Sequence, residues 1–465
     1  MKQQTAAATA APTTSGLGNS LKQRQLTMMG LGSAIGAGLF LGSGEGIMMA
    51  GPAVLISYLV AGTLIILVMW ALGEMAAANP NSGAFSVYAE KAMGTVAGAT
   101  VGWLWWLQLV VVIAAEALGA AHLLVTIWPV LPAWALTLIF MVVFTIVNLT
   151  SVKNYGEFEF WFALLKVTAI VLFLAFGIAL LLGIIPGAAS PGLDNLFSHG
   201  GFAPTGMAGI ASALFVVAFA FGGTEIVAVA AAETLNPERS VAVAVRTVVW
   251  RILVFYVGSI FIIAVVLPWT SEALLSPFAG VLNVAGLPWA GTVITLVAVA
   301  ALLSALNANL YGASRMIYSL AERAQAPRIF SSTNARFVPV AAVAVSVAFG
   351  FVTVVWELLY PDTVLKVLLN LVGSTCLIIW GSALLSQFIL RRRADRDGTA
   401  LPLRMRGFPW LTLAGLVLLL AIFAVGFSDP AGRGQLLSTF SLVAVIALLS
   451  KVSHKRRQRL AAERS

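Results

Sequence analysis

Apolar runs of about 20 residues recur along almost the whole chain, and this pattern restricts the fold more than any other feature. A helix of that length spans the hydrocarbon core of a bilayer, which is about 30 Å thick. The 465 residues are 60% hydrophobic and only 10% charged, so a soluble fold could not cover the apolar surface. A β-barrel would alternate apolar and polar residues, and these runs are continuously apolar. The sequence therefore predicts an all-α integral membrane protein.

The runs predict about twelve transmembrane helices. Their approximate bounds are 26–51, 52–75, 97–128, 132–149, 157–185, 206–232, 243–269, 288–320, 338–356, 361–390, 409–427 and 435–450. The polar residues before them, 1–21, are expected to form a disordered cytoplasmic tail, without a removable signal peptide. Residues 452–465 are expected to form a basic cytoplasmic tail.

Lysine and arginine residues predict the orientation of these helices. They gather before the first span and after the second, fourth, sixth, eighth, tenth and twelfth spans, which all lie on one side if there are twelve. The opposite side carries Arg433 and Lys366 among several acidic residues. Cytoplasmic loops are enriched in basic residues, so both termini are expected in the cytoplasm and the chain in the inner (plasma) membrane. The net charge of +9 then indicates topology and contacts with anionic membrane lipids, and no nucleic acid partner.

Two glycine-interrupted segments occupy corresponding places in the two halves of the chain. The first span contains residues 32–38 (GSAIGAG), and the sixth contains residues 221–225 (FGGTE). Paired interrupted helices are typical of a transporter with its binding site at mid-membrane. We expect a transport core at 22–405 with inverted repeats at about 26–185 and 206–390. The last two spans, at 406–451, lie outside the repeat.

The first interruption would expose backbone N–H groups at the start of a half-helix, which suit a carboxylate. The candidate contacts are Ser33, Ile35, Gly36, Ala37 and Gly38. The alternative is close helix packing through small residues.

The second interruption, at Gly222 and Gly223, would expose carbonyl groups that suit an ammonium group. Phe219, Ala220 and Phe221 flank it and are candidate substrate contacts. The alternative is a packing kink. Together, the two interruptions could hold both ends of a zwitterion.

Ionisable residues inside apolar spans are costly and are often functional. Glu116 lies mid-span and could contact substrate, carry a proton, or join helices. Lys166 could carry a proton or extend its ammonium to the cytoplasmic face. Glu225 could hold the second interruption open or act in function.

Other polar residues allow simpler interpretations. Glu45, Glu74, Glu157 and Glu159 lie near span ends and are expected at the membrane interface. The single cysteine, Cys376, is expected to be buried and inert.

Asn307 and Tyr311 share one face of the eighth span, and could line the pathway or join helices. Trp103, Trp105 and Trp106 are expected in an interfacial aromatic belt. The three histidines are far apart and no phosphate-binding Walker pattern appears, so we expect no metal, no cofactor, no ATP and no catalytic residue.

Several motifs, in order along the chain, resemble those of amino acid permeases in the amino acid–polyamine–organocation superfamily. They are residues 32–40 (GSAIGAGLF), 73–75 (GEM), 80–85 (PNSGAF) with Tyr88, 155–163 (YGEFEFWFA) with Lys166, and 219–225 (FAFGGTE) with Glu233, Asn236 and Pro237. The chain looks most similar to bacterial permeases for aromatic amino acids, followed by those for phenylalanine, proline and γ-aminobutyrate.

The resemblance implies a leucine-transporter-like fold with five-plus-five inverted repeats and alternating access. It implies that residues 33–38 hold the substrate carboxylate and that carbonyls at 219–221 hold the amine. Lys166 falls at the fifth-helix position where a lysine takes the place of a bound sodium ion in proton-coupled relatives. Glu116 falls at the third-helix position where many relatives carry a glutamate near the substrate site. Ala37 departs from the threonine or serine of many relatives, so a hydroxyl contact to the carboxylate is missing.

We therefore expect a secondary active importer driven by proton symport, not an enzyme. Its expected substrate is a neutral amino acid, with an aromatic one favoured. Its partners would be the substrate, protons and lipids, with no obligate protein partner. The alternatives are a γ-aminobutyrate or proline permease, or an exchanger. A substrate-gated sensor or channel is more remote, because channels need a continuous polar pore and these polar residues cluster near mid-membrane.

Overall fold

The computed structural model describes residues 35–79, 81, 83–150, 155–224, 253–335, 338–361, 363–428 and 430–463. In these residues every regular element is helical. Nine helices there are long and apolar enough to cross a membrane, and two shorter apolar helices span Gly206–Phe221 and Leu253–Val266. The prediction of an all-helical, multi-pass membrane protein is confirmed.

In the described residues the helices overlap the predicted spans, whereas residues 26–34 of the first span, 225–232 of the sixth and 243–252 of the seventh lie outside them. The long ones are α4 (Val54–Ala78), α6 (Thr95–Ile127), α7 (Ala133–Thr150), α8 (Tyr155–Leu181), α14 (Pro288–Glu322), α15 (Val340–Leu359), α16 (Val364–Arg396), α17 (Trp410–Ser428) and α18 (Pro430–Ala462). The shorter ones are α2 (Ala37–Phe40), α3 (Gly42–Ala50), α5 (Ala84–Met93), α9 (Gly206–Phe221), α12 (Gly258–Val266) and α13 (Pro277–Val284). A π-helical turn, η3 (Leu253–Val257), precedes α12, and 3-10 turns lie at η1 (Gly51–Ala53), η2 (Asp194–Leu196), η4 (Glu272–Leu275) and η5 (Arg328–Ser331).

Three features differ from the sequence expectation. α5 and α13 are helices in segments that were expected to be loops. α18 continues as one helix to Ala462, into the segment expected to be a separate basic tail. Lysine, arginine, glutamine and leucine are good helix formers, so the basic segment can extend the preceding helix.

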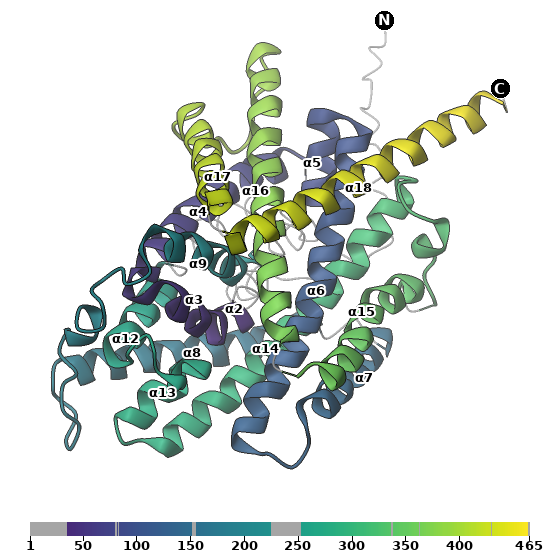
Figure 1. The fold of residues 1–465 in the computed structure, drawn as a ribbon. Coiled ribbons are helices and arrows are strands. Elements are labelled where there is room, and N and C mark those ends of the chain that lie inside the picture. The colour runs from purple at the N-terminus through teal and green to yellow at the C-terminus, as the bar shows by residue number, and fades with distance from the viewer. Residues whose placement is uncertain are drawn as a thin grey trace, which may run out of the picture.

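α6 lies at the centre of the bundle. It packs against α14, α16, α5, α15 and α18 (Figure 1). Its middle is buried on all sides, as expected for a helix that is apolar around its whole circumference. α18 crosses α6 obliquely, and its C-terminal part extends away from the other helices (Figure 1).

α5 is held against the ends of α6 and α14. Gly94, at φ +95°, makes the sharp turn between α5 and α6, a conformation that favours glycine. Glu90 Oε2 accepts hydrogen bonds from Arg323 Nη1 at 2.6 Å and from Gln325 Nε2 at 2.8 Å. The guanidinium of Arg323 and the amide of Gln325, just after α14, therefore join this segment to α5.

Glu74 lies near the end of α4, as the sequence predicts, but its carboxylate is not exposed there. Its side chain is buried between α4 and α16, where Arg391 Nη1 donates to Oε2 at 2.8 Å and Gln387 Nε2 donates to Oε1 at 3.0 Å. The backbone N–H of Met405 also donates to Oε2. The segment between α16 and α17 covers the end of α4, so a position near a helix end in sequence becomes interior in space.

Candidate functional site

The first interruption brings backbone and a buried carboxylate together. Gly36 is extended, with φ −146° and ψ −150°, and α2 begins at Ala37. The N–H of Ala37 lies 3.1 Å and 2.9 Å from the two carboxylate oxygens of Glu116. Glu116 comes from the middle of α6 and is buried. The backbone donor that the sequence assigned to a substrate carboxylate is therefore occupied by the protein's own carboxylate.

Gly36 is required for this approach. A Cβ added at Gly36 would overlap Oε1 of Glu116 and would come within 3.1 Å of the Ala305 Cβ on α14. Ile35, the preceding residue, is also buried. Ser33 lies outside the described residues. Gly36 thus allows the chain to pass between α6 and α14.

At the second predicted interruption the structure shows the end of a helix, and the residues after Thr224 lie outside the described part of the chain. α9 ends at Phe221, Gly222 is extended with ψ 147°, and Gly223 has φ +95°. The N–H of Gly222 donates to the Phe219 carbonyl at 2.9 Å, and the Thr224 hydroxyl donates to the Phe221 carbonyl at 3.0 Å. Glu225 lies outside the described residues.

The two interruptions lie against each other. A Cβ added at Gly38 would overlap the Cα of Ala220, so α2 and α9 meet with their backbones almost in contact. Phe219, Ala220 and Phe221 are all buried at this point. The structure therefore brings together the two segments that the sequence paired.

Lys166 is fully buried in α8, so its side chain does not extend to the surface of the protein. Its ammonium group lies within electrostatic reach of Glu159 and Glu116. Glu159, about two turns earlier on α8, is buried, and Ser304 Oγ donates to its Oε2 at 2.8 Å. Glu159 lies near the start of α8, as the sequence predicts, but its carboxylate is enclosed because α8 packs against α14. Two carboxylates and one ammonium thus form a buried charged group beside the first interruption.

Aromatic rings surround the second interruption. Phe221 packs on Tyr256 with ring centroids 4.9 Å apart and edge-on to Tyr58 at 5.9 Å. All three rings are fully buried. The Tyr58 hydroxyl has no hydrogen-bond partner among the described residues. Pairs of aromatic rings in such tilted arrangements attract one another beyond simple burial.

Asn307 lies apart from this group. Its Oδ1 accepts a hydrogen bond from Asn148 Nδ2 at 2.8 Å, which joins α14 to α7. Tyr311, one turn later, lies under the guanidinium of Arg315, which is 3.1 Å from the ring centroid. Of the two alternatives for Asn307, lining the transport pathway or joining helices, this hydrogen bond corresponds to joining helices.

Two residues that the sequence analysis did not assign to the site lie beside Gly222. Gln108 Nε2 donates to Cys376 Sγ at 3.0 Å, and a Cβ at Gly222 would be 3.3 Å from that sulfur. Both side chains are buried. Gln108 could have been found from spacing, because it precedes Glu116 by eight residues and so lies on the same face of α6. Cys376 carried no such signal.

Comparison with known proteins gives a consistent result. Residues 25–463 match the family model described as amino acid permease. The chain is 45% identical to the aromatic amino acid transport protein AroP of Corynebacterium glutamicum, over 94% of this chain and 96% of that protein. It is 43% identical to the γ-aminobutyric acid permease of Bacillus subtilis, over 95% of each. It is 35% identical to AroP of Salmonella typhimurium, over 89% of this chain and 91% of that one.

Proposed function

The chain belongs to the amino acid permease family and is a multi-pass membrane transporter, not an enzyme; from this premise we propose that it imports a neutral, aromatic amino acid by proton symport. The proposal includes alternating access in a leucine-transporter-like arrangement of two inverted repeats followed by two further spans. It also includes twelve spans in the inner membrane, with both termini in the cytoplasm.

The contact between Glu116 and Ala37 carries the proposal. A carboxylate that occupies the Ala37 N–H competes with a substrate carboxylate for the same donor. Protonation of Glu116 removes its charge and weakens this hydrogen bond, because bonds to ionised acceptors are roughly twice as strong as neutral ones. Proton binding from outside therefore favours substrate binding, and proton loss inside favours release. Such mutual dependence is what symport requires.

Lys166 contributes the second part of the coupling. Its ammonium lies within electrostatic reach of Glu116 and Glu159, so the charge on each carboxylate depends on the others. A buried ammonium group in this position supplies the positive charge that a bound sodium ion would supply, and it gains or loses that charge with a proton. Glu116 and Lys166 are the proposed coupling residues, with Glu159 as the partner that holds Lys166.

The remaining contacts are assigned from the two interruptions. Residues 33–38 are proposed to receive the substrate carboxylate through backbone N–H groups, and carbonyls of residues 219–221 are proposed to receive the amine. Gly222, Gly223 and Glu225 are proposed to maintain the second interruption. The cluster of Tyr58, Phe221 and Tyr256 supports an aromatic substrate, because its rings can pack against a substrate ring.

The experiment is uptake of labelled phenylalanine into proteoliposomes, with an imposed pH gradient and with or without sodium. Uptake should follow the pH gradient, ignore sodium and vanish in Lys166→Ala. Sodium dependence, or unchanged uptake in Lys166→Ala, would overturn the coupling. Competition by each amino acid identifies the substrate.

A γ-aminobutyrate permease is the second candidate, favoured by the 43% identity to the Bacillus subtilis permease of that name. Competition by γ-aminobutyrate stronger than by phenylalanine would select it. An exchanger would instead show counterflow of two amino acids without any pH gradient.

A further inference from the structure

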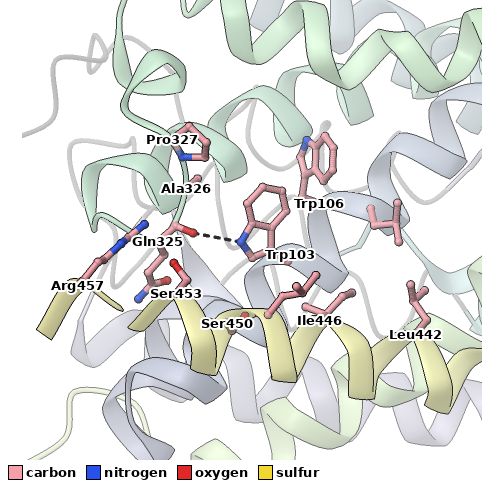
Figure 2. A pocket seen from close by; sticks show the side chains of 12 residues that line it. Trp103, Trp106, Gln325, Ala326, Pro327, Leu442, Ile446, Ser450, Ser453 and Arg457 are labelled. Atoms are coloured by element: carbon pink, nitrogen blue, oxygen red, sulfur yellow. Dashed lines mark hydrogen bonds between the residues drawn. The ribbon is translucent and has the colours of Figure 1, made fainter. Parts of the chain in front are cut away.

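A groove on the outside of the bundle lies apart from the proposed substrate-binding and coupling residues. It has a volume of about 460 Å³ and lies between α6, α18 and the segment that follows α14. Trp103 and Trp106 of α6 form one wall, and Leu442, Ile446 and Arg457 of α18 form the other (Figure 2). None of the proposed substrate contacts lines it. The groove is therefore separate from the proposed substrate site.

The α18 wall changes from apolar to polar along its length. Its lining residues are spaced so that they share one face of the helix, and they are Leu442, Ile446, Leu449, Ser450, Ser453 and Arg457. From Leu442 to Arg457 the helix rises about 22 Å, at about 1.5 Å per residue. Figure 2 shows Arg457 and Ser453 near Gln325 at one end, and Leu442 and Ile446 toward Trp106 at the other. The groove is thus a long amphipathic surface with a cation at one end.

The tryptophan wall is fixed in place by its own hydrogen bonds. Trp103 Nε1 donates to the Gln325 carbonyl at 3.2 Å, and Trp106 Nε1 donates to Ser346 Oγ at 3.0 Å. The two rings also meet edge to face, with centroids 5.5 Å apart. Both indole N–H groups are therefore used, and the rings offer the groove only their apolar surfaces. A preformed wall reduces the entropy lost when a flexible chain packs on it.

The polar end of the groove carries an excess of positive charge. Arg457 is half-buried, and no acidic side chain in the described part of the chain forms an ion pair with it. Glu90 lies near this end, but its carboxylate is held by Arg323 and Gln325. Four further basic residues, Lys451, Lys455, Arg456 and Arg459, surround Arg457 in sequence. The end of the groove therefore attracts an anion.

The amide of Gln325 adds a hydrogen-bond acceptor at the same end. Its Nε2 donates to Glu90, so the other amide atom, Oε1, is an acceptor. Oε1 is buried and has no hydrogen-bond partner among the described residues. A ligand with a hydroxyl group could satisfy it after a small side-chain movement.

We propose that this groove is a specific binding site for one anionic phospholipid. An acyl chain lies between the tryptophan rings and the apolar face of α18, and the phosphate pairs with Arg457 and the neighbouring serine hydroxyls. A basic groove between helices on the cytoplasmic side is the form that such lipid sites take in membrane proteins. Arginine suits a phosphate because its planar fork donates two parallel hydrogen bonds. The inference rests on the proposed orientation, in which the end of α18 is cytoplasmic, and is independent of the proposed substrate and of the proton coupling.

The test uses the purified full chain in detergent, with phosphatidylglycerol or phosphatidylcholine added at the same mole fraction. Native mass spectrometry measures lipid retained per chain, and thermal unfolding measures stabilisation. Phosphatidylglycerol should be retained and should raise the unfolding midpoint more than phosphatidylcholine. Arg457→Gln should weaken phosphatidylglycerol binding about tenfold, because it removes a charge-assisted hydrogen bond. The matched control, Arg456→Gln, removes the same charge from an exposed neighbour and should bind as the unaltered chain does.

Equal effects of Arg457→Gln and Arg456→Gln would overturn the site in favour of diffuse surface charge. Equal retention of the two lipids, or a chain dimer that excludes lipid from the groove, would also overturn it. A second measurement requires no variant. Hydrogen exchange of amides in 442–457 should slow with phosphatidylglycerol and not with phosphatidylcholine, and equal protection by both lipids would contradict the proposal.

Discussion

The carboxylate of Glu116 lies against the backbone N–H of Ala37, with oxygen–nitrogen distances of 2.9 Å and 3.1 Å. One residue comes from the middle of a continuous helix and the other begins a half-helix, so the contact joins a titratable group to the interruption. A glutamine in place of Glu116 has nearly the same shape and can still accept this hydrogen bond, but it has no proton to exchange.

Glu116→Gln should therefore separate binding from coupling. We expect counterflow of substrate at equal pH to persist, and accumulation driven by a pH gradient to be lost. Both are measured with labelled phenylalanine in proteoliposomes. Glu272→Gln, which alters an exposed acid, is the control and should transport normally. Accumulation in Glu116→Gln that still follows the pH gradient would rule out this residue as the proton carrier.

Gly38→Ala should strongly impair transport, because the added Cβ overlaps the backbone of Ala220 and must push α2 away from α9. Overpacking of this kind costs about 1–3 kcal/mol, so we expect about a tenfold or greater loss of uptake at similar expression. Gly434→Ala is the matched control, since a Cβ there meets open space. Similar uptake by both variants would show that the close approach is not needed.

Glu74 and Arg391 form a buried ion pair, and Arg391 also pairs with the more exposed Asp395. We expect Arg391→Gln, which leaves the buried Glu74 carboxylate without its cation, to lower stability by about 3–5 kcal/mol. Glu74→Gln should cost less because Asp395 still pairs with Arg391, and the double variant should lose less than the sum of the two. Thermal unfolding in detergent measures this as a lower midpoint. Arg392→Gln, at an exposed neighbour, should have little effect. Additive losses in the double variant would mean that the two side chains do not interact.

Cys376 is the only cysteine in the chain, so labelling by a thiol reagent reports on one position. The sulfur is buried beside Gly222 and accepts a hydrogen bond from Gln108. We expect slow labelling by a small permeant maleimide, and slower labelling still when substrate occupies the site. The measurement is the time course of mass increase, with Cys376→Ser as the unlabelled control. A labelling rate that substrate leaves unchanged would argue against substrate beside this residue.

Helix placement could be predicted from the sequence because it depends on local composition. A continuous apolar run of about 20 residues has few alternatives to a spanning helix. The helices of α5 and α13 were missed because they are short and owe their order to the surfaces on which they pack.

The segments that make up the candidate site could be selected from the sequence, since glycine-rich interruptions and charges inside apolar runs are easily recognised there. Which groups meet could not be read from it. Glu74 and Glu159 lie near helix ends in the sequence, and distant segments cover them. Asn307 was one of several polar residues on its helix, and only the packing of α7 against α14 shows that it contacts Asn148. Occupation of the Ala37 N–H by Glu116 depends on the depth at which two helices cross, which no local pattern encodes.

The two hydrogen bonds that Glu90 receives from Arg323 and Gln325 have a mechanical consequence. α5 belongs to the proposed first repeat, whereas Arg323 and Gln325 follow the long helix α14 of the second. The Trp103 indole, also from the proposed first repeat, donates a hydrogen bond to the Gln325 carbonyl in the same segment. If one repeat rocks against the other during transport, α5, Trp103 and the segment after α14 must move together as a rigid unit, or the hydrogen bonds between them must break. It can therefore serve as the pivot around which the other helices swing, or as the latch that their movement has to release.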